Sequence, residues 1–152
     1  MPDSILEFKG EYHFLDNFYP APITWEGIVY PTSEHAFQAA KTFDTELRKN
    51  IANTSSPFRA KKMGRNVELR SDWEECKYRL MEEIVLAKFL QNPELQEKLL
   101  ATGNAHLEEG NHHADTTWGT VDGKGENWLG KILMSVRECL KRELEEKGNI
   151  TQ

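Results

Sequence analysis

Three polar side chains with complementary chemistry, Glu34, Gln38 and Lys41, follow one another at spacings of four and three residues. A helix turns by about 100° per residue, so this spacing predicts a carboxylate, an amide and an amine in one sector of a helix. If surrounding loops cover Lys41, desolvation lowers its pKa and a fraction of the amine becomes neutral, able to attack an electrophilic carbon. The same spacing is also typical of an ordinary solvated helix face, which stays the alternative.

The helix that would carry these side chains has a clear start. Pro31, Thr32 and Ser33 precede it, and a hydroxyl there accepts a hydrogen bond from a first-turn amide, so we expect the helix to begin near Thr32. Because Glu34 lies in the first turn, the helix dipole is expected to favour its ionised form and a role as acceptor or base. The opposite, apolar side carries Ala36, Ala39, Ala40 and Phe43.

A second group of candidate residues lies in an irregular segment, residues 104–126, which is longer than a compact domain normally keeps without a function. It holds Asp115, Trp118 and Gly119, followed by the run Gly123-Lys124-Gly125-Glu126-Asn127 at the start of the last helix. Backbone amides at a glycine turn before a helix bind anions well, so we expect this loop to take part in ligand binding. The glycine spacing matches neither a Walker loop nor a dinucleotide-binding fingerprint.

Two other groups of residues are weaker candidates. Lys77 is a rival amine, but a lysine stem that follows the apolar stripe of its helix explains it better. The adjacent His112 and His113, with Asp115, lack the regular ligand spacing of a metal centre. We therefore expect no metal site.

Length and charge limit the class of protein. The chain has 152 residues, enough for one compact domain with a core of its own. Its formal net charge of −6 argues against broad attachment to nucleic acid, although two or three cations suffice to hold a phosphate-bearing ligand. Lys61, Lys62 and Arg65 form such a cluster, in which Lys61 and Lys62 are expected to be solvated.

The cysteines and the hydropathy pattern indicate where the protein resides. Cys76 and Cys139 have no paired spacing and no secretory leader precedes them, so we expect ordinary buried thiols in a reducing, cytoplasmic setting. No apolar run approaches the roughly 20 residues that span a bilayer, so a soluble protein without a membrane partner is expected.

The elements expected around these residues change from strand to helix along the chain. Small antiparallel β structure is predicted from the short apolar runs Ile5 to Phe8, Tyr12 to Phe14 and Ile23 to Tyr30. Helices are predicted after Asp44, from Ser56-Pro57 to Gly64, from a reciprocal cap at Ser71–Glu74 to about Gln91, from Asn92-Pro93 to Gly103, and from about Asn127 to Gly148, with a short strand at 106–108. The pattern predicts an α+β fold, one mostly helical domain over residues 1–148 with a tail at 149–152.

Taken in order along the chain, a series of motifs matches a known family. They are Phe14-Leu15-Asp16-Asn17-Phe18-Tyr19-Pro20, the segment from Tyr30 to Lys41, Met63-Gly64-Arg65, Trp73-Glu74, Trp118-Gly119 and the segment from Gly123 to Gly130. They resemble the NADAR family, also called YbiA-like, over nearly the whole chain. Asp16 is a departure, since family members often carry serine at that position.

The resemblance implies a mostly helical α+β domain with N-glycosidase activity and no metal or redox cofactor. By the same resemblance Lys41 matches a lysine proposed to form a Schiff base with a sugar's anomeric carbon, while Glu34 and Asp115 match acidic positions that would move protons. Tryptophans would line the pocket, asparagines would bind ribose or base, and a cation would hold phosphate. Together with the patterns above, the expected substrate-binding residues are Asn17, Gln38, Arg65, Trp73, Trp118, Gly119, Lys124, Gly125 and Asn127.

Family members divide between two groups of substrate, ribosylamine intermediates of the riboflavin pathway and ADP-ribose attached to guanine. The expected partner is therefore a small nucleotide or ribosylamine, or an ADP-ribosylated base of DNA or RNA. We favour the ADP-ribosylated base slightly because Trp73 and Trp118 can stack on it, although Trp73 is also a natural core anchor. The alternatives are a non-catalytic module that binds ADP-ribose or a nucleotide, and a helical interaction domain.

Overall fold

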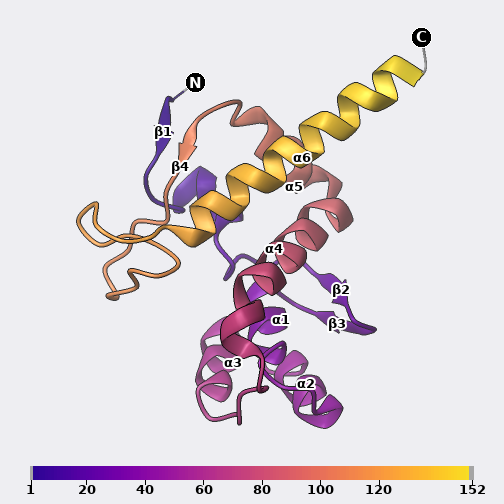
Figure 1. Cartoon of the computed structure of the whole chain (residues 1–152), viewed down its shortest axis with the longest axis vertical. Coiled ribbons are helices and arrows are strands. Elements are labelled where there is room, and N and C mark those ends of the chain that lie inside the picture. Colours follow the sequence, from indigo (N-terminus) through magenta and orange to yellow (C-terminus); the bar gives the residue numbers. More distant parts are fainter. Residues whose placement is uncertain (1, 151–152) are drawn as a thin grey trace. The chain divides into compact units, whose positions relative to one another are not determined.

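The computed structural model describes residues 2–150, with side chains described to residue 148, as two compact units. One unit, here the middle unit, is residues 16–92; the other, the terminal unit, joins residues 1–15 to residues 93–152. Helices dominate both, and the strands are short (Figure 1), so the mostly helical α+β class is confirmed. The single domain over residues 1–148 stays a prediction; helix α6 continues to Ile150, and residues 151–152 of the expected tail lie outside the described residues.

Helix α1, Ser33–Ala39, is the centre of the middle unit, because all seven of its residues are buried. It packs against α2, Thr45–Ala52, α3, Pro57–Gly64, and α4, Trp73–Gln91. The oxygen of the Thr32 side chain accepts a hydrogen bond from the His35 amide, so the predicted start at Thr32 is confirmed. The predicted starts of α2 and α3 are confirmed in the same way, by the caps Asp44 and Ser56.

The hairpin of the middle unit joins β2, Ile23–Trp25, to β3, Ile28–Tyr30. Its two turn residues, Glu26 and Gly27, have φ of 47° and 82°, the pair of positive values that tight antiparallel hairpins require. The side-chain amide of Gln91 at the end of α4 accepts from and donates to the Thr24 backbone, which ties β2 to that helix. The antiparallel β structure predicted at Ile23 to Tyr30 is therefore confirmed.

The terminal unit begins with a parallel pair that the sequence did not predict. Strand β1, Ser4–Ile5, pairs with β4, His106–Leu107, so the expected antiparallel arrangement is wrong here. The run Tyr12 to Phe14 was predicted as a strand but lies in the 3-10 helix η1, Gly10–Leu15. Short alternating apolar runs suit either structure, and the positive φ of 60° at Gly10 turns the chain into the helix.

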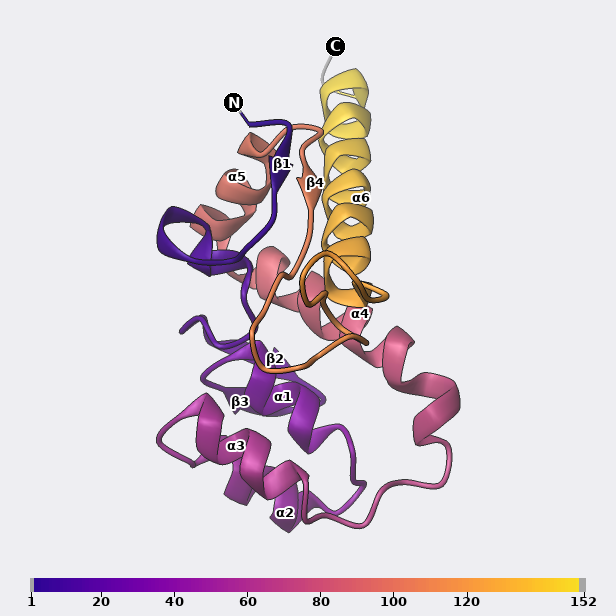
Figure 2. The ribbon, with the colours of Figure 1, turned by 90° about the vertical axis from the view of Figure 1, so that its left-hand side faces the viewer.

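The remaining helices follow the predicted order, with one different cap. Helix α5, Pro93–Ala101, packs against α6, Trp128–Ile150, and α6 also covers β4 (Figure 2). The reciprocal cap predicted at the start of α4 is absent, because the Asp72 carboxylate instead binds the Arg70 guanidinium at 2.6 and 3.0 Å. Cys76 is buried as expected, whereas Cys139 is exposed, because it lies on the outer side of α6. Within the described residues, no helix has the length and apolar character needed to cross a membrane.

Candidate functional site

The polar side chains of α1 are buried, so the stripe is not a solvated helix face. Glu34 and Gln38 are 7% and 5% exposed, and the Gln38 amide nitrogen donates a hydrogen bond to Glu34 Oε1 at 2.7 Å. Burial raises the pKa of Glu34, while the hydrogen bond from Gln38 and the nearby positive charges oppose that rise. The prediction that the helix dipole would favour the ionised form is wrong in direction, because desolvation outweighs the dipole of a seven-residue helix.

Lys41 lies two residues beyond the end of α1, in the turn that leaves the helix. Its backbone carbonyl accepts a hydrogen bond from the Arg70 amide at 2.8 Å, which fixes that turn. Burial lowers the pKa of Lys41, as predicted, and the charges of Arg65 and Lys61 lower it further, while Glu34 raises it. Glu34 thus interacts with Gln38 through a hydrogen bond and with Lys41 through charge, even though the helix stops short of the lysine.

Burial has a chemically useful effect on this pair. Desolvation is the largest cause of both shifts, and it favours the neutral acid at Glu34 and the neutral amine at Lys41. A neutral amine is a nucleophile, and a protonated carboxyl group can donate a proton to a leaving group. Gln38 can face Glu34 with either end of its amide, so it accommodates both protonation states of the carboxyl group.

Helix α3 supplies the cations near this pair. Lys61 acts electrostatically on both Glu34 and Lys41, and Arg65, which caps the end of α3, acts on Lys41. Of the two lysines expected on a solvated surface, Lys62 is exposed and Lys61 is half-buried. Gly64 makes the close packing of α3 against α1 possible, since a Cβ atom there would overlap the amide oxygen of Gln38.

Asn17 holds the segment before α1 against the start of that helix. Its side-chain oxygen accepts a hydrogen bond from the Ser33 hydroxyl at 2.8 Å, and its backbone carbonyl accepts one from the Glu34 amide at 3.1 Å. Asn17 is 7% exposed. Its observed contacts therefore position Glu34, and a direct role in substrate binding stays a prediction.

Trp73 belongs to the core of the middle unit. It is 6% exposed, and its ring packs on that of Phe37 with the ring centres 5.2 Å apart. A ring in this position has little free surface for a substrate, which favours the core anchor over the stacking platform.

The irregular segment of the terminal unit is held together by polar side chains. Asp115 Oδ1 accepts hydrogen bonds from the amides of Thr117 and Trp118 at 3.1 and 2.9 Å. Asn111 accepts from the amides of His113 and Asp115 and donates to the Asp115 carbonyl. Asn111 is the residue that sequence reasoning missed, and its position amid turn-forming residues was the only signal.

The other loop candidates have structural contacts as well. Asn127, with a positive φ of 53°, accepts from the Glu109 amide and donates to the Leu107 carbonyl, both at 2.9 Å. At Gly119 and Gly125 a Cβ atom would overlap neighbouring atoms, among them Glu109 O and Gly119 O respectively. Lys124 is exposed and closes a turn by exchanging two backbone hydrogen bonds with Val121. The loop residues are therefore gathered in one ordered segment of the terminal unit, and their roles toward substrate stay predictions.

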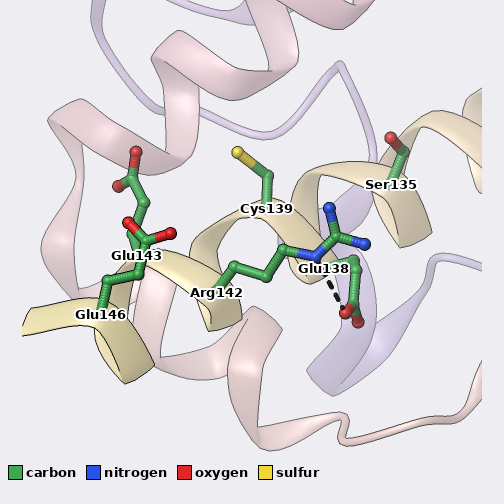
Figure 3. A pocket seen from close by; sticks show the side chains of 6 residues that line it. All are labelled: Ser135, Glu138, Cys139, Arg142, Glu143 and Glu146. Atoms are coloured by element: carbon green, nitrogen blue, oxygen red, sulfur yellow. Dashed lines mark ion pairs between the residues drawn. The ribbon is translucent and has the colours of Figure 1, made fainter. Parts of the chain in front are cut away.

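A separate hollow lies along one side of α6 (Figure 3). Its lining residues all come from that helix and include an ion pair of Arg142 with Glu138 at 3.5 Å: Ser135, Glu138, Cys139, Arg142, Glu143 and Glu146. A hollow lined by one helix offers no converging groups to hold a substrate. In the part of the chain that the structure describes, no three histidine, cysteine or carboxylate side chains are grouped to bind a metal.

Comparison with known proteins gives consistent matches over nearly the whole chain. A family model described as the NADAR domain matches residues 7–141. N-glycosidase YbiA of Shigella flexneri is 43% identical over 149 residues, covering 94% of this chain and 92% of that protein. A riboflavin biosynthesis protein of Vibrio vulnificus is 43% identical over 143 residues, covering 92% of this chain and 39% of that protein. The NMR structure of the Escherichia coli protein YbiA superposes with a TM-score of 0.85 at 42% identity, over 96% of this chain and 90% of that one.

Proposed function

Since this chain belongs to the NADAR family and is an N-glycosidase, we propose that its substrate is a ribose joined through an exocyclic nitrogen to a heteroaromatic base. The observation that carries the proposal is the pair of a buried acid, Glu34, and a half-buried amine, Lys41, whose pKa values desolvation moves in opposite directions. Both groups are thereby favoured in the neutral forms that exchange one nitrogen for another at a sugar carbon.

We place Lys41 as the nucleophile. When the ribosylamine opens, its C1 becomes an iminium carbon to which the neutral Lys41 amine adds. Glu34 gives a proton to the base nitrogen, the bond from that nitrogen to C1 breaks, and Glu34 recovers a proton from the added amine. Water then adds to the lysine iminium, the sugar leaves as its aldehyde, and the Lys41 amine is restored. One water is consumed for each C–N bond broken.

Of the two substrate groups, we propose a ribosylaminopyrimidine phosphate of the riboflavin pathway in preference to the ADP-ribosylated guanine. Two observations support this order. A relative that is 43% identical over most of this chain is named a riboflavin biosynthesis protein. The preference for the ADP-ribosylated base relied on two tryptophans, and Trp73 is 6% exposed against Phe37.

The test is turnover of both substrates by the parent protein and by Lys41→Ala. We expect the variant to lose on the order of a thousandfold in kcat, because the nucleophile is removed. Borohydride added during turnover should attach one sugar phosphate to Lys41 of the parent, as read by peptide mass. The matched control is Lys49→Ala, which removes an exposed lysine of α2. Its kcat should equal that of the parent.

Three outcomes of this test would contradict parts of the proposal. Full turnover by Lys41→Ala would remove the lysine from the mechanism, and faster release from ADP-ribosyl-guanine would reverse the order of substrates. Tight binding of ADP-ribose with no turnover of either substrate would favour the binding module instead.

A further inference from the structure

We propose that Phe58, supported by Phe18, forms the surface on which the heteroaromatic base of the substrate stacks. This inference rests on the proposed function, because it assigns a place in the same site to the base that leaves. It replaces Trp73, whose ring lies in the core against Phe37.

Phe58 has the exposure that a stacking surface needs. It is 73% exposed, the highest value among the exposed large hydrophobic residues of the described chain. Its ring meets the Phe18 ring edge to face, with centres 4.8 Å apart and planes at 89°. Edge-to-face packing fixes the orientation of Phe58 and leaves a ring face open to solvent. Apolar surface held in this way by a structured neighbour suits a flat ligand.

The positive charges near Phe58 indicate the chemistry of the ligand that this surface would bind. Phe58, Lys61 and Arg65 stand at positions i, i+3 and i+7, so they share one face of α3. The Lys61 ammonium lies 5.9 Å from the centre of the Phe18 ring. An aromatic ring followed by two cations along a helix is complementary to a planar base followed by a sugar phosphate.

The same cations connect this face to the reacting groups. Lys61 acts electrostatically on Glu34 and Lys41, and Arg65 acts on Lys41. Helices α1 and α3 lie side by side in the middle unit (Figure 2). A base on Phe58 would therefore lie at the edge of the site, with the sugar extending toward Lys41 and the phosphate near Lys61 or Arg65.

The kinetic test compares Phe58→Ala, Phe58→Leu and Phe58→Tyr with the parent. Loss of stacking is expected to lower kcat/KM about tenfold for the alanine variant, mainly through KM, since the base is held equally in ground and transition states. Leucine keeps apolar bulk without an aromatic face and should resemble alanine, whereas tyrosine should restore most of the loss. Val29→Ala changes an exposed apolar residue of β3 and serves as the control.

A binding test keeps the inference separate from the proposed function. Calorimetry with UMP, GMP and ribose 5-phosphate should show that the parent binds the nucleotides more tightly than the sugar phosphate. Phe58→Ala should bind all three with similar affinity. If no N-glycoside is turned over but this pattern holds, the proposed function fails and the stacking surface stands. If the nucleotides bind Phe58→Ala as tightly as they bind the parent, or no more tightly than ribose 5-phosphate in the parent, the inference is overturned.

Discussion

The reactivity of the site depends on how Glu34 and Lys41 share one environment. Burial favours the neutral form of each, while the attraction between their charges favours the ionised forms. In the proposed mechanism the active pair is the neutral one, so kcat/KM should rise with pH as Lys41 loses its proton and fall as Glu34 loses its own. The surrounding charges then decide at which pH each limb of the profile lies.

The Glu34→Gln variant tests this coupling. Glu34 holds the pKa of Lys41 up, so removing its charge should move the acid limb of the pH profile to lower pH. The alkaline limb should flatten, and the maximum should fall on the order of a hundredfold with the proton donor gone. Lys61→Met should move the acid limb the other way, because Lys61 lowers the pKa of Lys41. An acid limb that stays in place in both variants would contradict the coupling.

At this scale the sequence predicted that Glu34 and Gln38 share one side of the helix, but not the protonation state that burial favours at Glu34. The direction of the Lys41 shift followed from the assumption that loops cover it. The direction of the pKa shift of Glu34 could not be predicted, because a residue's position in a helix does not show how deeply that turn is buried. Lys61 and Gly64 also required the structure, since their effects depend on how α3 packs against α1.

At the scale of elements, the close approach of α3 to α1 depends on Gly64, which has no side chain. Gly64→Ala places a methyl group where the Gln38 amide oxygen lies, and it also crowds the Cδ and Cβ atoms of the buried Gln38 side chain, which limits how that side chain can relax. We expect a loss of about 1–3 kcal/mol in the free energy of unfolding, and a clear loss of kcat because Gln38 and Glu34 must shift together. Urea unfolding and turnover measure the two effects.

Gly148→Ala is the matched control for this substitution. That glycine lies in α6 with open space where the methyl group of alanine would stand, so alanine should leave stability the same or raise it by about 0.5–1 kcal/mol through helix propensity. If Gly64→Ala were equally harmless, the close packing of α3 on Gln38 would not be what positions the acid.

Helix starts were predictable because their signals are local. The side chains of Thr32, Asp44 and Ser56 each accept a hydrogen bond from a first-turn backbone amide, as the sequence indicated. The pairing of β1 with β4 was not predictable, since the two strands lie about one hundred residues apart in the chain and each has only two residues. The order of the loop around Asn111 was hidden for a different reason: its hydrogen bonds are local, but they run to backbone groups rather than forming a recognisable motif.

At the scale of the whole molecule, the chain forms its two units in an interleaved order. The first fifteen residues join the segment after residue 92, while the residues between form the middle unit. A linear pattern of capped helices gives no sign of this division, because it arises from contacts between the two ends of the chain. Composition and length do not distinguish one continuous core from two.

Lys88 gives the stability of the molecule a defined pH dependence. It is 1% exposed within the middle unit, and its ammonium donates to the Asp16 carbonyl at 3.0 Å, with the rings of Tyr19 and Phe89 nearby. Burial lowers the pKa of Lys88 to about 7, although the Asp16 charge opposes the shift. The unfolded chain keeps the ordinary value of about 10.4, so above pH 7 it holds a proton that the folded chain lacks.

Stability therefore rises with pH from about 7 toward the unfolded value, by up to about 1.4 kcal/mol for each pH unit from this group alone. Lys88→Met should remove that contribution, so the difference in unfolding free energy between parent and variant should grow in favour of the parent between pH 7 and pH 9. Urea unfolding at several pH values measures it, with Lys49→Met on the surface of α2 as the control. Taking the difference cancels the groups common to both proteins, and a difference that is constant with pH would mean that Lys88 stays charged in the folded chain.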